Sequence, residues 1–141
     1  MEKNATLDDV LDAGIMGARD GFLFSKKVAK PLAVASVEKR IHLAVGIGKS
    51  GRGWEDTLQE LADIVGTGLA ANEAIPCAFG ILAANPDSAT QAIKMAVNIG
   101  GDTNMIATIV GAIAGALYGV DALPSGISGM IRNTNGFDLE W

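Results

Sequence analysis

Apolar positions recur at intervals of three and four residues along most of this chain, a spacing typical of amphipathic helices. At the first such segment Thr6 is a good capping residue, and Asp9 lies in the first turn, where a negative charge suits the helix dipole. We therefore expect a helix that begins after Thr6. Its apolar face is formed by Leu7, Val10, Leu11, Ile15 and Phe22.

The same period, interrupted by glycines and prolines, predicts a second segment opened by Pro31 and ending in the glycine-rich stretch 46–53. Pro76 suits the first turn of a fourth helix. Further helices are expected at 54–65, 76–84, 89–99, 105–118 and about 124–132, with an irregular tail at 133–141. No segment shows sustained two-residue alternation, so we predict an all-α fold without a sheet. We expect the chain to form one compact domain, residues 1–141, of about six to seven helices.

Composition narrows the class of protein. Hydrophobic residues make up 49% and charged residues 19%, and the net charge is −5, which argues against a nucleic-acid-binding surface. The charge-free run from Thr103 to Val120 contains Gly111 and Gly115 but lies between two aspartates, so we expect a buried helix rather than a membrane span. The chain has a single cysteine, Cys77, whose thiol we expect to be buried. Because one cysteine cannot form an intramolecular disulfide, we also expect a cytoplasmic protein.

Two motifs have simple structural explanations. The stretch Gly46–Gly51 matches G-x-G-x-x-G, but a phosphate loop would need glycine where Leu43 stands, and a helical pattern precedes it. We expect a glycine-rich connection between helices. His42, the single histidine, has no nucleophile near it in the sequence and is expected to be a partly buried structural residue.

The stretch from Gly100 to Met105 is the strongest candidate for chemistry. Asp102, Thr103 and Asn104 follow a double glycine and could simply cap the next helix. In a locally extended segment, however, residues 102 and 104 point the same way and could both reach one Mg²⁺ or Mn²⁺ ion. A second acidic cluster is possible at residues 7–9, which also fit a first helical turn.

Residues 100–107, Gly-Gly-Asp-Thr-Asn-Met-Ile-Ala, are followed by a glycine-laced helix. They resemble the Gly-Gly-Asp-Thr-Asp-Thr motif of the ADP-ribosylglycohydrolase family, which includes the dinitrogenase-reductase-activating glycohydrolases. Upstream, residues 66–68 and 73–76 resemble that family's Glu-Ser-Val-Pro turn. The resemblance is specific from about Gly66 to Pro124, and the first 65 residues fit the family's helical middle loosely.

The resemblance implies an all-α hydrolase with two Mg²⁺ or Mn²⁺ ions. Family members cleave the N- or O-glycosidic bond of ADP-ribose attached to a protein or small molecule. By position, Asp102 is the first metal-binding aspartate, Asn104 replaces the second, and Met105 replaces a hydroxyl ligand. Glu73 and Thr103 are candidates for the substrate side, with a first-turn acid as the simpler explanation of Glu73. No catalytic residue is assigned.

Family members are about twice this length, and the family's N-terminal segments with the remaining metal ligands are absent here. We therefore expect the C-terminal half of such a hydrolase, inactive alone and associating with the missing half or with itself. The expected substrate is an ADP-ribosylated protein or small molecule, or a related N-ribosyl compound, and neither nucleic acid nor membrane is an expected partner. The alternatives are a non-catalytic descendant that binds ADP-ribose or a protein, and a purely structural helical module.

Overall fold

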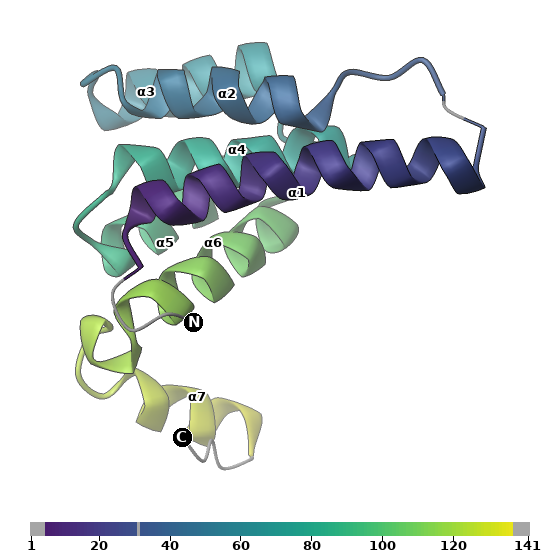
Figure 1. Ribbon diagram of the computed structural model, residues 1–141. Coiled ribbons are helices and arrows are strands. Elements are labelled where there is room, and N and C mark those ends of the chain that lie inside the picture. The colour runs from purple at the N-terminus through teal and green to yellow at the C-terminus, as the bar shows by residue number, and fades with distance from the viewer. Residues whose placement is uncertain (1–4, 31, 137–141) are drawn as a thin grey trace.

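The computed structural model describes residues 5–30 and 32–136, and within them the chain forms seven α-helices, two other helical turns and no strand (Figure 1). This arrangement confirms the all-α prediction. The α-helices are α1 Leu7–Val28, α2 Val37–Gly48, α3 Trp54–Glu60, α4 Ala71–Ala84, α5 Ala89–Val97, α6 Thr103–Tyr118 and α7 Ile127–Asn135. A π-helical turn, η1 Leu61–Val65, continues α3, and a 3₁₀ turn, η2 Val120–Ala122, follows α6.

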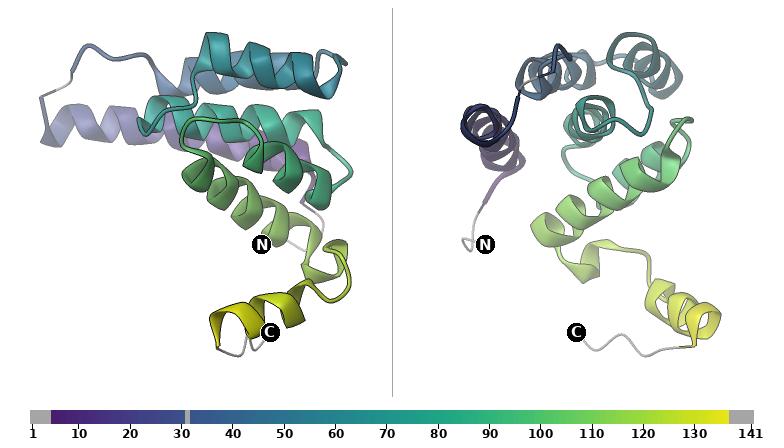
Figure 2. Two further views of the ribbon diagram at one scale, coloured as in Figure 1. Left: turned by 180° about the vertical axis from the view of Figure 1, so that it is seen from behind. Right: turned by 90° about the vertical axis from the view of Figure 1, so that its right-hand side faces the viewer.

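Helix α4 is the centre of the fold, because every residue from Pro76 to Ala83 is buried. Helix α2 packs against one side of α4 and α6 against another, while α5 packs on α6 (Figure 2). Helix α1 lies along α2 and α4. The largest fully buried side chains, which come from four of these elements, are aliphatic: Ile41, Leu61, Ile81, Leu82 and Ile106.

The crossing of α2 and α4 depends on two glycines. A Cβ atom on Gly48 would lie 2.2 Å from the carbonyl oxygen of Gly80, and a Cβ on Gly80 would lie 2.9 Å from the carbonyl oxygen of Ala44. Helix α2 continues through Gly48, and Lys49 forms an ion pair with Asp8 at 2.7 Å. The glycine-rich stretch is therefore a helix end packed against α4, in agreement with the predicted connection.

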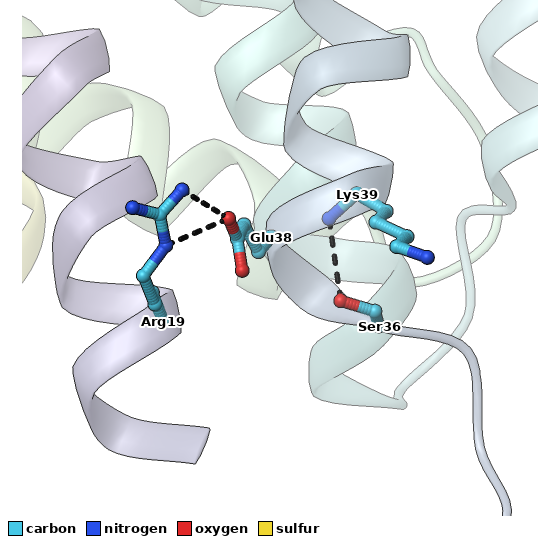
Figure 3. Close-up of polar contacts among 4 residues, drawn as sticks. All are labelled: Arg19, Ser36, Glu38 and Lys39. Atoms are coloured by element: carbon cyan, nitrogen blue, oxygen red, sulfur yellow. Dashed lines mark hydrogen bonds and ion pairs between the residues drawn. The ribbon is translucent and has the colours of Figure 1, made fainter. Parts of the chain in front are cut away.

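Polar side chains fix the ends of the first two helices. Thr6 and Asp9 form the two hydrogen bonds of a capping box, which confirms the predicted start of α1. Ser36 caps α2 by accepting a hydrogen bond from the backbone N–H of Lys39 (Figure 3). In the same view Arg19 donates two hydrogen bonds to one carboxylate oxygen of Glu38, joining α1 to α2. The predicted opening by Pro31 falls outside the described residues.

Several predicted boundaries are wrong. Helix α4 begins at Ala71, so Pro76 lies inside it and not in its first turn. The predicted third helix changes to π-helical hydrogen bonding at Leu61, where the N–H of Gly66 donates to the Leu61 carbonyl. Glycine at position 66 then ends it as expected. Helix α5 ends at Val97 and not at residue 99, and α7 covers Ile127–Asn135 and not residues 124–132. The predicted irregular tail is therefore helical up to Asn135, and its residues 137–141 lie outside the described part.

Exposure also differs from the sequence-based expectations. His42 is exposed, not partly buried. Helix α6 is buried on one face only, through Ile106, Val110 and Ala114. No described helix combines the length and apolar character needed to cross a membrane.

Large apolar side chains are exposed on the second half of α1 and just after it, where α1 extends beyond its neighbours (Figure 1): Phe22, Leu23, Phe24, Val28, Leu32 and Val34.

The thiol of Cys77 is fully buried in α4, as predicted, and burial raises its pKa from 9.0 to about 12. Because the unfolded thiol ionises first, this group lowers the stability of the folded state as pH rises from 9.0 towards 12. The thiolate is the reactive form. We expect iodoacetamide at pH 8 to label the unfolded chain rapidly and the native chain slowly, as followed by mass spectrometry. Equal labelling rates would contradict this burial.

Candidate metal-binding site

Two loops meet beside the N-termini of α4 and α6 (Figure 2). The backbone N–H of Asp102 donates to the carbonyl oxygen of Thr67 over 2.6 Å. Gly101, with φ +61°, makes this approach possible, because a Cβ atom there would lie 2.3 Å from both the carbonyl and the hydroxyl oxygen of Thr67. The double glycine therefore places Asp102 directly against the loop that precedes α4.

Asp102 caps α6, and its carboxylate is only partly used. Oδ1 accepts a long hydrogen bond of 3.4 Å from the N–H of Met105. Oδ2 is buried and has no hydrogen-bond partner among the described residues. A buried carboxylate oxygen without a partner is costly, and a bound cation or water is the usual explanation. A carboxylate oxygen is also the ligand that Mg²⁺ and Mn²⁺ prefer, so this atom fits one ligand position of a divalent cation.

The carboxylate of Glu73 braces the loop before α4. Its Oε2 atom accepts a hydrogen bond of 2.9 Å from the N–H of Gly68. The carboxyl group also lies so close to Gly66 and Gly68 that a Cβ atom on either glycine would come within 3.0 Å of it. Glu73 is thus a first-turn acid of α4 whose charge is directed at the loop, and the loop is the one that holds Asp102.

The predicted extended conformation at residues 102–104 is wrong. Because Asp102 acts as the cap, α6 begins at Thr103, and Asn104 belongs to the first helical turn. Asn104 is exposed, Thr103 is half-buried, and 47% of Met105 is exposed. Asn104 therefore stands at the exposed edge of the site, two residues after the capping aspartate.

No group of three or more His, Cys, Asp or Glu side chains within residues 5–30 and 32–136 is arranged to hold a metal ion. The possible second cluster near the N-terminus has other roles, because Asp9 completes the capping box of α1 and Asp8 pairs with Lys49. Within the described residues, Asp102 thus offers one candidate ligand, with Asn104 nearby in sequence, and no complete ligand set is formed.

Three contributors to the site were missed by the sequence analysis. Thr67 accepts the hydrogen bond from Asp102, the π-turn directs the chain into the Thr67 loop, and Arg40 donates to the carbonyl of Asn72 over 2.8 Å. Of these, only the need for a donor such as Arg40 had a signal in the sequence, and that signal is Pro76. Pro76 leaves the carbonyl four residues earlier without its helical donor, so a helix that starts before residue 72 needs a replacement donor.

The described chain is all-α, and the Gly-Gly-Asp-Thr sequence at the start of α6 resembles the motif of the ADP-ribosylglycohydrolases. The comparisons with known proteins agree with this resemblance. The sequence model of the ADP-ribosylglycohydrolase family matches residues 2–139, and the chain belongs to this family. The match includes the first 65 residues, which resembled the family only loosely. No solved structure matches the chain.

Curated relatives cover the chain in part. The chain is 30% identical to the uncharacterized protein YegU of Escherichia coli (strain K12) over 105 residues, 74% of this chain and 31% of that protein. It is 36% identical to human ADP-ribosylhydrolase ARH3 over 78 residues, 48% of this chain and 22% of the relative. It is 40% identical to ADP-ribosylhydrolase ARH3 of Gallus gallus over 80 residues, 50% of this chain and 21% of the relative. The matched residues therefore correspond to less than a third of each relative.

Proposed function

We propose that this chain is part of a metal-dependent hydrolase that cleaves the glycosidic bond of ADP-ribosylated or related N-ribosyl substrates. The proposal includes a C-terminal position in the whole enzyme and no activity of the chain alone. Membership of the ADP-ribosylglycohydrolase family and the similarity to proteins named ADP-ribosylhydrolase support the reaction class. The single thiol, Cys77, is compatible with the cytoplasmic location that we also propose.

The observation that carries the proposal is the buried, unpartnered Oδ2 atom of Asp102. We assign Asp102 as an anionic ligand to Mg²⁺ or Mn²⁺ and Asn104 as a neutral carbonyl ligand, while Met105 offers no hard oxygen. Such a cation, when bound, lowers the pKa of water and orients it for attack. The remaining ligands for one or two ions then come from outside the described residues.

Glu73 and Thr103 are proposed to serve the substrate side in different ways. Thr103 lies in the first turn of α6, where backbone N–H groups attract phosphate oxygens such as those of ADP-ribose. Glu73 acts through the loop that it braces, by keeping Gly68 and Thr67 in place. Thr103 thus contacts the ligand in this proposal, and Glu73 shapes the wall beside it.

The proposed partners follow from charge and exposed surface. The net charge of −5 disfavours nucleic acid. The exposed apolar side chains on α1, including Phe22, Phe24 and Val28, are typical of a surface that another protein surface covers. We propose that the remainder of the hydrolase, or a second copy of this chain, covers them, and that the substrate is an ADP-ribosylated protein or small molecule.

Titration of MnCl₂ into the purified chain tests the ligand assignment. We expect Asp102→Asn to weaken Mn²⁺ binding by about tenfold or more, because even loss of outer-sphere partners of a metal ligand has an effect of this size. Asparagine is also a good helix cap, so the variant should fold. Asp121→Asn, which changes an exposed residue in η2 just beyond the far end of α6, is the matched control for charge and should bind like the wild type. Equal weakening in both variants would contradict the assignment.

Release of ADP-ribose from an ADP-ribosylated protein, with Mg²⁺ or Mn²⁺ present, tests the remaining part. The isolated chain is expected to release none above the buffer control. Robust metal-dependent release by this polypeptide would overturn the proposed inactivity while leaving the metal assignment to the titration.

A second candidate function is a non-catalytic descendant that binds ADP-ribose or a protein. The absence of a three-membered ligand group within the described residues and the methionine at position 105 favour it. Calorimetry with ADP-ribose in the presence of a chelator separates the two candidates. Binding without metal supports the descendant, and binding only with Mg²⁺ or Mn²⁺ supports the hydrolase site.

A further inference from the structure

Pro76 leaves a gap in the hydrogen bonding of α4. It lies inside the helix, which begins at Ala71. Proline has no N–H, and its ring crowds the carbonyl four residues earlier, which is that of Asn72. This carbonyl therefore lacks its helical donor at a half-buried position, where an unpaired polar group is costly.

The guanidinium of Arg40 fills this gap. Its Nη1 atom donates to the Asn72 carbonyl over 2.8 Å in a partly buried contact between residues 32 positions apart. Arg40 lies on α2, one residue before the fully buried Ile41, so its backbone is anchored in the core. The first turn of α4 is thus tied to α2 by a charged donor, and hydrogen bonds with a charged partner are stronger than neutral ones.

The anchored turn directly follows the Thr67 loop, which contacts Asp102. Glu73, the residue after Asn72, holds the N–H of Gly68 with its carboxylate. Between Gly66 and Gly68, Thr67 offers its carbonyl to the N–H of Asp102. Three successive hydrogen bonds therefore connect Arg40 to the residue that carries the unpartnered carboxylate oxygen.

We propose that Arg40 is a positioning residue for Asp102, acting through Asn72, Glu73 and the Thr67 loop, and that Pro76 makes it necessary. The part of this proposal that concerns metal affinity rests on the proposed function. The effect of Arg40 on the Thr67 loop does not depend on any metal. A change at Arg40 loosens the first turn of α4, moves the carboxylate of Glu73, and weakens the hydrogen bond between Asp102 and Thr67.

A cycle of four chains tests this coupling: the wild type, Arg40→Met, Pro76→Ala, and the double variant. The first readout is amide hydrogen exchange at Asp102, whose N–H is held by Thr67. We expect Arg40→Met to accelerate this exchange at least about tenfold, because the loop opens locally. In the Pro76→Ala background the N–H of residue 76 can donate to Asn72, so Arg40→Met should change the exchange less than about twofold.

The second readout is the affinity for Mn²⁺ alone. Arg40→Met should weaken it by about tenfold, an effect typical of an outer-sphere partner, and Arg40→Lys should restore most of it because lysine can still donate to the carbonyl. Gly48→Ala is the control for general destabilisation, because it disturbs α2 against α4 at a different point and should leave the Mn²⁺ affinity of the folded chain unchanged.

The outcomes distinguish this proposal from the proposed function. If the wild type does not bind Mn²⁺, the metal assignment fails, and amide exchange still decides the role of Arg40. Exchange at Asp102 that is the same in Arg40→Met and the wild type would overturn the positioning role. An equal effect of Arg40→Met with and without Pro76 would overturn the role of the proline. If Arg40→Met does not fold, the proposal requires the double variant with Pro76→Ala to fold, and a double variant that also fails to fold would overturn it.

Discussion

Gly101→Ala is expected to lower the free energy of unfolding by about 3 kcal/mol, the sum of left-handed strain and a backbone clash. Gly101 has φ +61°, and its Cβ would lie 2.3 Å from two oxygen atoms of Thr67. Neither the carbonyl of Thr67 nor the backbone of Gly101 can move without breaking the hydrogen bond to Asp102. The loss should be measured by urea unfolding followed by circular dichroism, with an unchanged slope.

The neighbouring glycine provides the control for this prediction. Gly100 also has a positive φ of +81°, but a Cβ atom there has open space around it. Gly100→Ala should therefore lose only the strain, about 1 kcal/mol, and should retain the contact between Thr67 and Asp102. If the two variants are equally stable, the close approach of the two loops is not what selects glycine at position 101.

Gly48→Ala is expected to lower the free energy of unfolding by about 2–3 kcal/mol, the cost of overpacking a rigid contact. The added methyl group would lie 2.2 Å from the Gly80 carbonyl oxygen and 3.0 Å from the backbone nitrogen of Ala84. Since α4 is buried along this stretch, the C-terminal ends of α2 and α4 must move apart locally to make room. Urea unfolding measures this loss, which is large for a domain whose total stability is on the order of 5–15 kcal/mol.

Gly46 is the matched control, because it lies two residues earlier in the same helix and faces open space. Gly46→Ala should raise the free energy of unfolding by about 0.5–1 kcal/mol, since alanine favours the helix. Opposite signs for the two alanine variants are expected if the glycine-rich stretch serves helix packing. A loss at Gly46 equal to that at Gly48 would contradict this explanation.

Local signals in the sequence predicted the helix ends that local chemistry decides. Thr6 and Asp9 predicted the start of α1, and Gly66 predicted the end of the third helical segment, because capping and glycine conformations involve neighbouring residues only. The start of α4 was not predicted. With Pro76 inside the helix, the carbonyl of Asn72 needs a donor from Arg40, 32 positions away from Asn72, and no local pattern identifies that partner.

The candidate site likewise has features that the sequence predicted and features that depend on the fold. The residue type of Asp102 predicted a helix cap, and the family motif singled it out as a ligand. The burial of its Oδ2 atom depends on the fold, and the predicted extended segment through Asn104 failed because the cap starts α6 at once. The brace formed by Glu73 likewise depends on how the chain turns between Gly66 and Gly68, which residue types alone do not specify.

The central claim is that Asp102 ligates a divalent cation, and paramagnetic broadening by Mn²⁺ tests it most directly. In the ¹⁵N-labelled chain, substoichiometric Mn²⁺ should erase the amide signals of residues 101–105 and of the Thr67 loop first, while those of η2 and α7 persist. In Asp102→Asn the same addition should leave these signals in place. Broadening that is absent, spread over the surface, or identical in Asp102→Asn would contradict the claim.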